Sequence, residues 1–519
     1  MNYSVPAGLE ESLVELFGRE NVSENPLDLL LYGRDCAPTA ILKMQEGRWQ
    51  SNARFVVWPR EVRQIAELFK LAQQKRFAVI PYGGGSGVCG GAEAVMPSVI
   101  VDMKKMDRVI ELDTYSKVVR VQGGIITEHL ERYLNAHGHT LGHFPASIYC
   151  CTIGGNLATR SAGQLSSKYG KIEDMVIGLE VVTPKGQVIR IRPAPRRATG
   201  PDIAQLFVGS EGTFGIITEA TLRIWKLPEE RIFGAFKFPD VASGIRAMRE
   251  IMQSDIRPAV MRFYDELDTA FSGVGKEGDS LLDALPLKEA ASLLKSVFPG
   301  FVKAAQRMVL SHAELLNLVD KVVKDGCLLI LSCEGNAKMC KLEFEEAKRI
   351  CTEAGAEYLG PAPAQRWWKH RYGVSYKQSK VFHMGAFVDT IELATSWDRV
   401  PKLYEEVRAA IAKHALVLAH FSHAYPDGCS IYFTFVTSGL RLEDRLKAHA
   451  RIWQDAMRAC LKIGATISHH HGVGLVRSEW MPQELPSSFR ILEIIKSDLD
   501  PNDVTNPGKL GFNGKRRES

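Results

Sequence analysis

Three glycine-rich loops, each next to an apolar strand pattern, restrict the fold of this chain more than any other feature of its sequence. They occupy residues 81–87, 145–159 and 209–220. Glycine lets backbone N–H groups turn toward an anion, as in the nests that bind phosphate. The first loop is followed by no Gly-Lys-Ser/Thr and opens no clear helix, so it is neither a P-loop nor a clean dinucleotide-fold fingerprint. Alone, each loop is as well explained by a flexible turn, but three together predict a long ligand that carries a pyrophosphate.

The order of predicted strands and helices indicates an α+β chain. Between residues 55 and 228, strand patterns alternate with amphipathic helices, the clearest of which is residues 61–74. Residues 176–182 and 187–191 flank a Thr-Pro-Lys-Gly turn and predict a hairpin. Residues 229–450 differ, because strand patterns at 233–238 and 326–332 enclose a helical stretch that is richer in charge. Further strand patterns at 390–394 and 429–436 give two strand–helix–strand units in all. This part of the chain predicts a separate α+β cap.

Composition excludes several classes of protein. The chain has 519 residues, of which 45% are hydrophobic and 24% charged, as is typical of a globular protein. This length predicts roughly two to four domains, and the net charge of +5 does not predict a nucleic-acid partner. The ten cysteines include no Cys-x-x-Cys pair, and the N-terminus lacks a signal peptide, so we expect reduced thiols and a cytoplasmic location. No apolar run is long enough to span a bilayer, which leaves peripheral membrane contact open.

Three consecutive histidines, His469, His470 and His471, are followed by a Gly-Val-Gly turn near the end of the chain. Imidazoles titrate near neutrality and suit acid–base chemistry. The run could equally be a metal-binding tract or part of a solvated loop. Because it follows the apolar residues 461–467, we expect it to lie at the end of a strand, beside the ligand of the glycine loops.

The order of these loops resembles the FAD-binding domain of the vanillyl-alcohol oxidase type of flavoenzyme. Over nearly the whole chain, the sequence is similar to one branch of that family, the alkyldihydroxyacetonephosphate (alkylglycerone-phosphate) synthases of ether-lipid synthesis. The stretches that carry the similarity are residues 142–145 (GHFP), 199–202 (TGPD), 257–262 (RPAVMR), 396–400 (SWDRV), 430–433 (SIYF) and 469–474 (HHHGVG). The resemblance implies an α+β fold, in which a two-subdomain FAD-binding domain is joined to an α+β cap domain.

The resemblance also implies a division of the chain. We expect a helical N-terminal lead-in at residues 1–50, the FAD-binding domain at 51–228 and the cap or substrate domain at 229–450. A C-terminal segment at 451–519 would complete the active site.

FAD, held without a covalent bond, is the cofactor that the resemblance implies, and no metal is expected. The first loop and residues 147–152 would hold the pyrophosphate, with the third loop along the nucleotide half. The expected FAD contacts are Pro81, Gly83, Gly84, Gly85, Ser86, Gly87, Pro145, Ser147, Thr152, Gly154, Gly155, Asn156, Ala158, Thr159, Glu211, Gly212 and Ile217. In that branch the flavin performs no net oxidation. Its N5 captures the first carbon of acyl-dihydroxyacetone phosphate, the fatty acid leaves, and a fatty alcohol takes its place.

Five side chains match active-site positions of the family, namely Tyr432, His470, His471, His143 and Arg262. By resemblance, Tyr432 would assist proton removal from the substrate carbon. His470 would be the base or acid for the incoming alcohol or the leaving acid. The other three would shape the site and help to hold anionic groups.

Ordinary structural roles remain open for these residues. His143 could be a satisfied loop histidine, and Tyr432 a core aromatic with its hydroxyl paired. Arg262 could pair with a carboxylate at position 265 or 266. Strand alternation places Tyr432 and Thr434 on one face and their apolar neighbours on the other, which directs the hydroxyl away from the apolar face.

The match to the family fails at one position. The family has a further arginine, thought to bind the anionic end of the substrate, and that position falls on Gln378. Lys377, Lys380 or Arg371 could supply the charge, although a lysine lacks the bidentate fork of arginine. A small-molecule or lipid phosphate substrate is expected, with its identity open. Peripheral membrane contact and a homodimer are open in the same way.

A D-2-hydroxy-acid dehydrogenase on the same fold is the alternative enzyme, oxidising a lactate- or glycolate-type substrate and passing electrons to an acceptor. Metal-dependent members place a glutamate and a strand histidine where this chain has His470 and Tyr432. His420 and His423 could still ligate zinc with the histidine run, but no carboxylate accompanies them in the sequence. A non-catalytic FAD-binding electron-transfer subunit is the third hypothesis. It predicts loss of the polar cluster that this chain retains.

Overall fold

A computed structural model describes residues 5–271, 326–373, 382, 386–439 and 441–512. The chain forms two compact units. Unit 1 contains Met1–Gly163, Gly170–Leu227 and His470–Ser519, and unit 2 contains Gln164–Tyr169 and Pro228–His469. These five segments alternate between the units along the sequence, so the chain passes from one unit to the other four times.

Unit 1 begins with a small sheet built around a parallel strand–helix–strand motif. Its order is β1-β2-β4-β3, with β2 and β3 each parallel to β4 and β1 antiparallel to β2. The strands are β1 (Val22–Ser23), β2 (Ala53–Val57), β3 (Ala78–Tyr82) and β4 (Ser98–Asp102), and α4 (Val62–Lys75) joins β2 to β3. The predicted helix at 61–74 and the predicted strands on either side of it are therefore confirmed.

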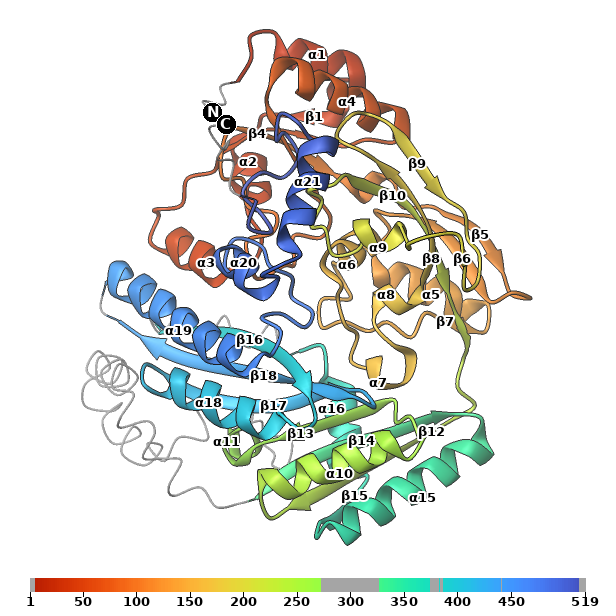
Figure 1. The fold of residues 1–519 in the computed structure, drawn as a ribbon. Helices are drawn as coiled ribbons and strands as arrows, with labels where there is room; N and C mark the ends of the chain where they lie inside the picture. Colours follow the sequence, from red (N-terminus) through yellow and green to blue (C-terminus); the bar gives the residue numbers. More distant parts are fainter. Residues whose placement is uncertain (1–4, 272–325, 374–381, 383–385, 440, 513–519) are drawn as a thin grey trace, which may run out of the picture. The chain divides into compact units, whose positions relative to one another are not determined.

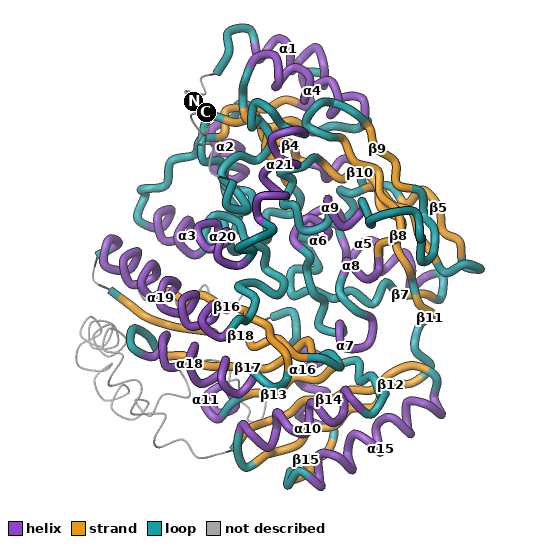
Figure 2. The backbone as a smooth tube through the Cα atoms, viewed as in Figure 1, coloured by secondary structure: helices purple, strands orange, loops and turns teal. Residues whose placement is uncertain are grey.

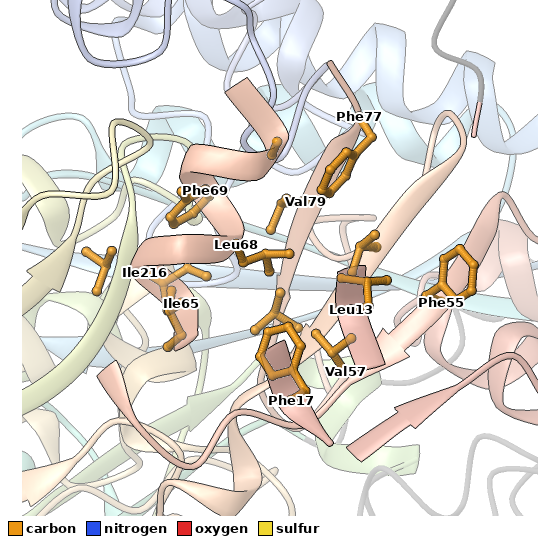
Figure 3. Packing of buried hydrophobic residues seen from close by; sticks show 14 of the residues in the cluster. Leu13, Phe17, Phe55, Val57, Ile65, Leu68, Phe69, Phe77, Val79 and Ile216 are labelled. Carbon is orange, nitrogen blue, oxygen red and sulfur yellow. The ribbon is translucent and has the colours of Figure 1, made fainter. Parts of the chain in front are cut away.

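Helix α4 shows why this part of the chain folds as the sequence predicts. Glu61 and Gln64 form a capping box that pairs the first orphan N–H groups of the helix. Ile65, Leu68 and Phe69 lie on one face and are fully buried against the sheet and α1 (Leu9–Phe17), as Figure 3 shows. Burying three such side chains stabilises the unit by roughly 1.5–3 kcal/mol each.

Unit 1 also contains a five-stranded antiparallel sheet and a two-stranded ribbon. The larger sheet has the order β5-β6-β10-β8-β9, and the ribbon pairs β11 with β7. The strands are β5 (Val109–Asp113), β6 (Val118–Gln122), β7 (His139–Thr140), β8 (Val176–Val182), β9 (Val188–Ile191), β10 (Ile216–Arg223) and β11 (Trp225–Lys226). The predicted hairpin is β8–β9, which confirms the turn between them.

Besides α1 and α4, the helices of unit 1 are short and lie in the connections between its strands and in its C-terminal segment (Figure 2). They are α2 (Pro26–Tyr32), α3 (Pro38–Gln45), α5 (Thr127–Ala136), α6 (Ile153–Thr159), α8 (Ile172–Met175), α9 (Ala204–Phe207), α20 (Met481–Glu484) and α21 (Phe489–Leu499). Among the described residues of either unit, no helix combines the length and the apolar character that crossing a membrane requires.

Unit 2 is built on one seven-stranded antiparallel sheet (Figure 1). Its order is β15-β12-β14-β13-β17-β18-β16. The strands are β12 (Glu230–Phe238), β13 (Val260–Tyr264), β14 (Cys327–Gly335), β15 (Glu357–Gly360), β16 (Ala386–Ser396), β17 (Leu416–Ala424) and β18 (Gly428–Ser438). The helices are α7 (Ser166–Tyr169), α10 (Val241–Gln253), α11 (Glu266–Phe271), α15 (Ala337–Glu353), α16 (Ala362–His370), α18 (Val400–Ala412) and α19 (Leu442–Ile463). The predicted α+β fold is confirmed.

The two faces of this sheet are covered differently. Helices α10, α15, α18 and α19 lie along the apolar face, where Gly244 meets Phe263 and Tyr404 meets Phe421. Helices α7 and α16 contact strands of the same sheet, and Trp368 of α16 packs on Phe233 of the opposite face. That opposite face carries polar side chains on its central strands.

Two local predictions are wrong, and one strand was not predicted. Residues 239–271, expected to be helical, include strand β13, and the rest of that stretch, 272–325, lies outside the described residues. Residues 416–424 form β17, which the sequence analysis did not predict. The apolar residues 461–467 are not a strand, since α19 runs to Ile463 and ends at Gly464 with a left-handed φ of 74°. Only Thr466 makes an isolated bridge, to Ala394. Leu461, Ile463, Ala465 and Ile467 alternate with other residues, and this spacing makes the end of the helix resemble a strand.

Candidate functional site

The three glycine loops lie against one another in unit 1. A Cβ atom on Gly83 would be 2.4 Å from Thr152 Oγ1, and one on Gly84 would be 2.0 Å from the carbonyl oxygen of Cys150. The third loop meets the first, because a Cβ on Gly212, whose φ is +75°, would lie 2.7 Å from Pro81 Cγ. Glycine is therefore required here for close approach between the loops as well as for conformation.

The first loop offers hydrogen-bond donors in the way that an anion requires. Within the part of the chain that the structure describes, the N–H groups of Gly84, Gly85 and Gly87 donate to no protein acceptor. Gly85 has a φ of +61°, which reverses the direction of the backbone between them. Successive open N–H groups at such a reversal form a phosphate nest. The loop therefore fits the pyrophosphate of FAD.

The second loop is ordered by its own side chains. Thr152 caps α6 by accepting a hydrogen bond from the Gly155 N–H at 3.2 Å. Asn156 is buried and donates to Thr127 Oγ1 at 2.8 Å, and Thr159 donates to the Gly155 carbonyl at 3.1 Å. A Cβ on Gly154 would lie 2.9 Å from the carbonyl oxygen of Gly123. These predicted FAD residues thus have structural partners, and their contacts with FAD stay predictions.

The other predicted FAD residues lie in the same loops. The carbonyls of Pro145 and Ser147 accept turn hydrogen bonds from Ile148 and Cys150, and the carbonyl of Ala158 accepts one from the Glu211 N–H at 2.9 Å. Ile217 lies on β10 and is buried.

A buried carboxylate holds the turn that follows the histidine run. Glu211 accepts hydrogen bonds from the Val473 and Gly474 N–H groups, the latter at 2.9 Å to Oε2. Arg477 is fully buried and donates to the Gly472 carbonyl at 2.8 Å from the other side of the turn. Burial raises the pKa of Glu211 to about 7 against these hydrogen bonds. Glu211 therefore positions His470 and His471, whose rings meet edge to face at 4.5 Å.

His143 lies in the interior of unit 1. Its side chain is fully buried, and Nε2 pairs with Ser161 Oγ at 2.9 Å. Burial, with a smaller contribution from Lys171, lowers the pKa of His143 to about 3. The ring is therefore neutral at neutral pH, and no proton donor of imidazolium type is available at this position.

In unit 2, the register of the sheet brings polar side chains from distant strands onto one face. Tyr264 on β13 pairs with His420 on β17, which pairs with Tyr432 on β18, which in turn pairs with Glu392 on β16. Paired residues of neighbouring strands share a face, so these four form one row across the sheet. Arg262 lies two residues before Tyr264 on the same face. The predicted outward direction of Tyr432 is confirmed, because Ile431, Phe433 and Phe435 are fully buried while Tyr432 and Thr434 are partly exposed.

Tyr432 and Glu392 each have defined partners in this row. The Tyr432 hydroxyl donates to Thr390 Oγ1 at 3.1 Å, and desolvation raises its pKa to about 12. Glu392 is fully buried and accepts a hydrogen bond from Ser468 Oγ at 2.9 Å. Ser468 immediately precedes the histidine run, so Glu392 fixes the start of that run within unit 2.

Arg262 pairs with neither carboxylate that the sequence suggested. Its Nε donates to the Tyr264 hydroxyl at 2.9 Å, and its Nη2 lies 2.7 Å from His420 Nε2. Positions 265 and 266 are not its partners among the described residues, so the alternative of a local ion pair is wrong.

The strand histidines have hydrogen-bond partners as well. His420 Nδ1 lies 3.1 Å from Asp268 Oδ2, so both of its ring nitrogens are engaged. His423 Nδ1 pairs with Ser166 Oγ at 2.7 Å, and its ring stacks on His469. Across the described ranges, no cluster of three or more His, Cys, Asp and Glu residues is arranged to hold a metal ion.

Sequence reasoning missed Asp268, Thr390 and Glu392, and it considered His420 only as a zinc ligand. Arg262 and His420 are 158 positions apart in the chain, and His420 and Asp268 are 152 apart. No local motif joins them. The available signal was a polar residue at an alternating position in each strand pattern. The position of Gln378, with Lys377 and Lys380, lies outside the described residues.

Comparison with known sequences agrees with these features. Residues 53–192 match a family described as "FAD binding domain", and residues 227–510 match "FAD linked oxidases, C-terminal domain". An alkyldihydroxyacetonephosphate synthase from Dictyostelium discoideum is 30% identical over 91% of this chain and 75% of its own length. A glycolate oxidase subunit, GlcD, from Bacillus subtilis (strain 168) is 24% identical over 97% of this chain and 96% of its own length.

Solved structures give the same class of fold. A structure of an alkyldihydroxyacetonephosphate synthase aligns with a TM-score of 0.75 and 25% identity, covering 98% of this chain and 85% of that one. The chain belongs to the FAD-linked oxidases and has the vanillyl-alcohol oxidase type of fold. It is a FAD-dependent enzyme, and its relatives include both synthases and hydroxy-acid oxidases.

Proposed function

We propose that this enzyme exchanges the acyl group of acyl-dihydroxyacetone phosphate for a fatty alcohol, as an alkylglycerone-phosphate synthase. One observation carries the proposal from the structure: the row that contains Tyr432 also holds the guanidinium of Arg262 without a carboxylate partner among the described residues. Such a group suits a substrate with an anionic end. The similarity to synthases over most of the chain supports the lipid phosphate in particular.

The reaction needs one proton to be removed from the substrate carbon, one C–O bond to break and one to form. Bound FAD, held non-covalently, would supply an electron-rich ring nitrogen for the carbon. Tyr432 would assist the proton removal as a hydrogen-bonding group beside the substrate carbon, because a pKa near 12 keeps its hydroxyl protonated at neutral pH and unable to take a proton itself. Its hydroxyl donates to Thr390 Oγ1 at 3.1 Å.

The remaining predicted residues would act on the incoming alcohol and the leaving carboxylate, or bind the phosphate. His470 would take the proton of the incoming alcohol or support the leaving carboxylate, and His471 and neutral His143 would shape the site. Arg262 would bind the phosphate. A C-terminal segment from residue 451 would thus contribute catalytic groups, as the domain division predicts. A lipid substrate would require peripheral contact with a membrane surface.

A second candidate is oxidation of a D-2-hydroxy acid with electron transfer to an acceptor. The match to the glycolate oxidase subunit over nearly the full length of both chains favours it. Arg262 would then bind the substrate carboxylate.

The flavin spectrum separates the two functions. The purified holoenzyme is mixed without oxygen with palmitoyl-dihydroxyacetone phosphate or with D-lactate, and absorbance near the flavin maximum is followed with assays for free palmitate. For the synthase, the ketone phosphate alone bleaches the flavin and releases palmitate, and hexadecanol restores the colour. Bleaching by D-lactate alone, with recovery only after addition of an electron acceptor, would overturn the proposal in favour of the dehydrogenase.

A further inference from the structure

His420 connects two of the predicted active-site residues. It lies 2.7 Å from Arg262 Nη2 through Nε2, and its ring stacks on the ring of Tyr432 with centroids 4.7 Å apart and planes at 19°. Both contacts lie on the polar face of the sheet, in the row defined by the strand register. His420 itself is buried.

The hydrogen bonds of His420 define which nitrogen carries its proton. A guanidinium can only donate, so Nε2 must accept the hydrogen bond from Arg262. In a neutral imidazole, the other nitrogen then carries the hydrogen, and Nδ1 donates to Asp268 Oδ2 at 3.1 Å. Burial and the charge of Arg262 hold the pKa of His420 well below its ordinary value, which agrees with a neutral ring. Asp268 thus selects the tautomer that can accept from Arg262.

The guanidinium of Arg262 is aimed by neutral acceptors. Its Nε donates to the Tyr264 hydroxyl at 2.9 Å, and its Nη2 donates to His420. A carboxylate in direct contact would neutralise the guanidinium, and the structure gives Arg262 none among the described residues. Asp268 bonds the opposite nitrogen of the His420 imidazole, from where its charge interacts with that of Arg262 without direct contact. The side chain is therefore fixed in direction while its charge stays available.

We propose that Asp268 and His420 form a positioning pair, which aims the guanidinium of Arg262 at the anionic end of the substrate and supports the ring of Tyr432. The inference rests on the proposed function in one respect, since it places the substrate anion at Arg262. His420 acts through its neighbours and does not contact the substrate. His420 has two separate functions: Nε2 accepts a hydrogen bond from Arg262, and Nδ1 donates one to Asp268.

Three variants of His420 test this separation. Gln places an amide oxygen near the position of Nε2 and can still accept from Arg262. Asn reaches only to the position of Nδ1 and can still donate to Asp268, and Ala does neither. The matched control is His414→Ala, because His414 makes a similar histidine–aspartate pair with Asp455 at 2.8 Å, away from the polar row.

Binding is measured without turnover, by titrating dihydroxyacetone phosphate into each holoenzyme and following heat and the flavin spectrum. The Kd should rise about 10- to 100-fold in His420→Ala and His420→Asn, the size expected when a charged group loses a hydrogen bond that fixes it. It should rise less than about threefold in His420→Gln and in His414→Ala. Bound FAD should be the same in all four. With palmitoyl-dihydroxyacetone phosphate, KM should follow the same order, and kcat should also fall in Ala and Asn because the ring of Tyr432 loses its support.

The outcomes distinguish this inference from the proposed function. An unchanged Kd in His420→Ala, or equal losses in Ala and Gln, would overturn the positioning pair, whether or not the wild type is a synthase. If the wild type binds D-lactate and not the ketone phosphate, the synthase proposal fails, and the same variants then test the pair with D-lactate. If the wild type binds neither anion, the placement of an anion at Arg262 is wrong and both proposals fall.

Discussion

The glycine loops of unit 1 and the polar sheet face of unit 2 are two ways of building a site. In the loops, backbone approaches backbone, and a single Cβ on Gly84 would lie 2.0 Å from the Cys150 carbonyl. On the sheet face, side chains from four strands are placed by register, and most of their contacts are hydrogen bonds between side chains. The loops should therefore fail when an atom is added, and the sheet face when an atom is removed.

Removing the side-chain groups that we propose take part in proton transfer should have the largest effect, which is on kcat. Tyr432→Phe deletes one oxygen, and His470→Ala deletes an imidazole, so each should lower kcat by about 100-fold or more if the groups move protons. Both should keep FAD, because neither residue belongs to the glycine loops. Steady-state turnover of the substrate identified by the spectral test, with flavin content measured in parallel, checks this.

Tyr115→Phe is the control for these variants, since Tyr115 is 98% exposed and should be neutral. Full activity in Tyr432→Phe and in His470→Ala would contradict the assignment of the site.

Adding one methyl group to the loops should weaken cofactor binding and leave the sheet intact. Gly84→Ala must push the first loop away from Cys150, and overpacking of this kind weakens FAD binding by about 10-fold. The bound FAD per protein and the Kd for FAD added back to the apoprotein measure the effect. Gly91→Ala is the matched control, because a Cβ there would meet only a Glu211 oxygen, at 4.0 Å. Equal FAD binding by the two variants would show that the loops are flexible turns.

The turn after the histidine run combines both kinds of construction, because a side chain holds backbone groups. Glu211→Gln turns an NH₂ group toward an N–H donor of Val473 or Gly474 and should lower the free energy of unfolding by about 1–3 kcal/mol. Urea unfolding at pH 8, above the raised pKa of Glu211, measures the difference. Glu219→Gln is the comparison, since its ion pair with Arg120 is partly exposed and should change stability by less than about 0.5 kcal/mol. A loss no larger than that in Glu211→Gln would contradict the proposed support of the turn.

The last expected effect concerns stability at acidic pH. The ordinary histidine pKa of 6.5 is lowered to about 3 in folded His143, so between these values the unfolded chain binds a proton that the folded chain does not. Stability is therefore lost as the pH falls below 6.5, by about 2 kcal/mol at pH 5. His143→Gln should remove this part of the pH dependence, whereas His137→Gln, at an exposed position, should retain it. Identical pH profiles for wild type and His143→Gln would mean that His143 is not buried as the structure shows.

The two regions also differ in what sequence alone predicts. Local patterns predict α4 and the β8–β9 hairpin correctly, because capping residues, apolar spacing and turn residues lie within a few positions of each other. They do not predict the contacts of His420, whose partners Arg262 and Asp268 are separated from it by more than 150 residues. Strand β17 was not predicted, although His420 and Ser422 alternate with apolar residues in it, and all nine of its residues are buried. The sheet register, which no local pattern contains, determines that part of the site.

The alternation of five segments between the two units constrains how such a gene can be rearranged. Unit 1 is completed only when residues from His470 onward have been made, after the whole of unit 2. A single recombination event within the chain cannot exchange one unit for that of a relative, because at least two exchanges are needed, near residues 228 and 469. The short segment Gln164–Tyr169 would still come from the original parent. An exchanged cap would therefore have to accept Tyr169 of α7, whose hydroxyl bonds Glu334 of β14, as a foreign residue against its own sheet.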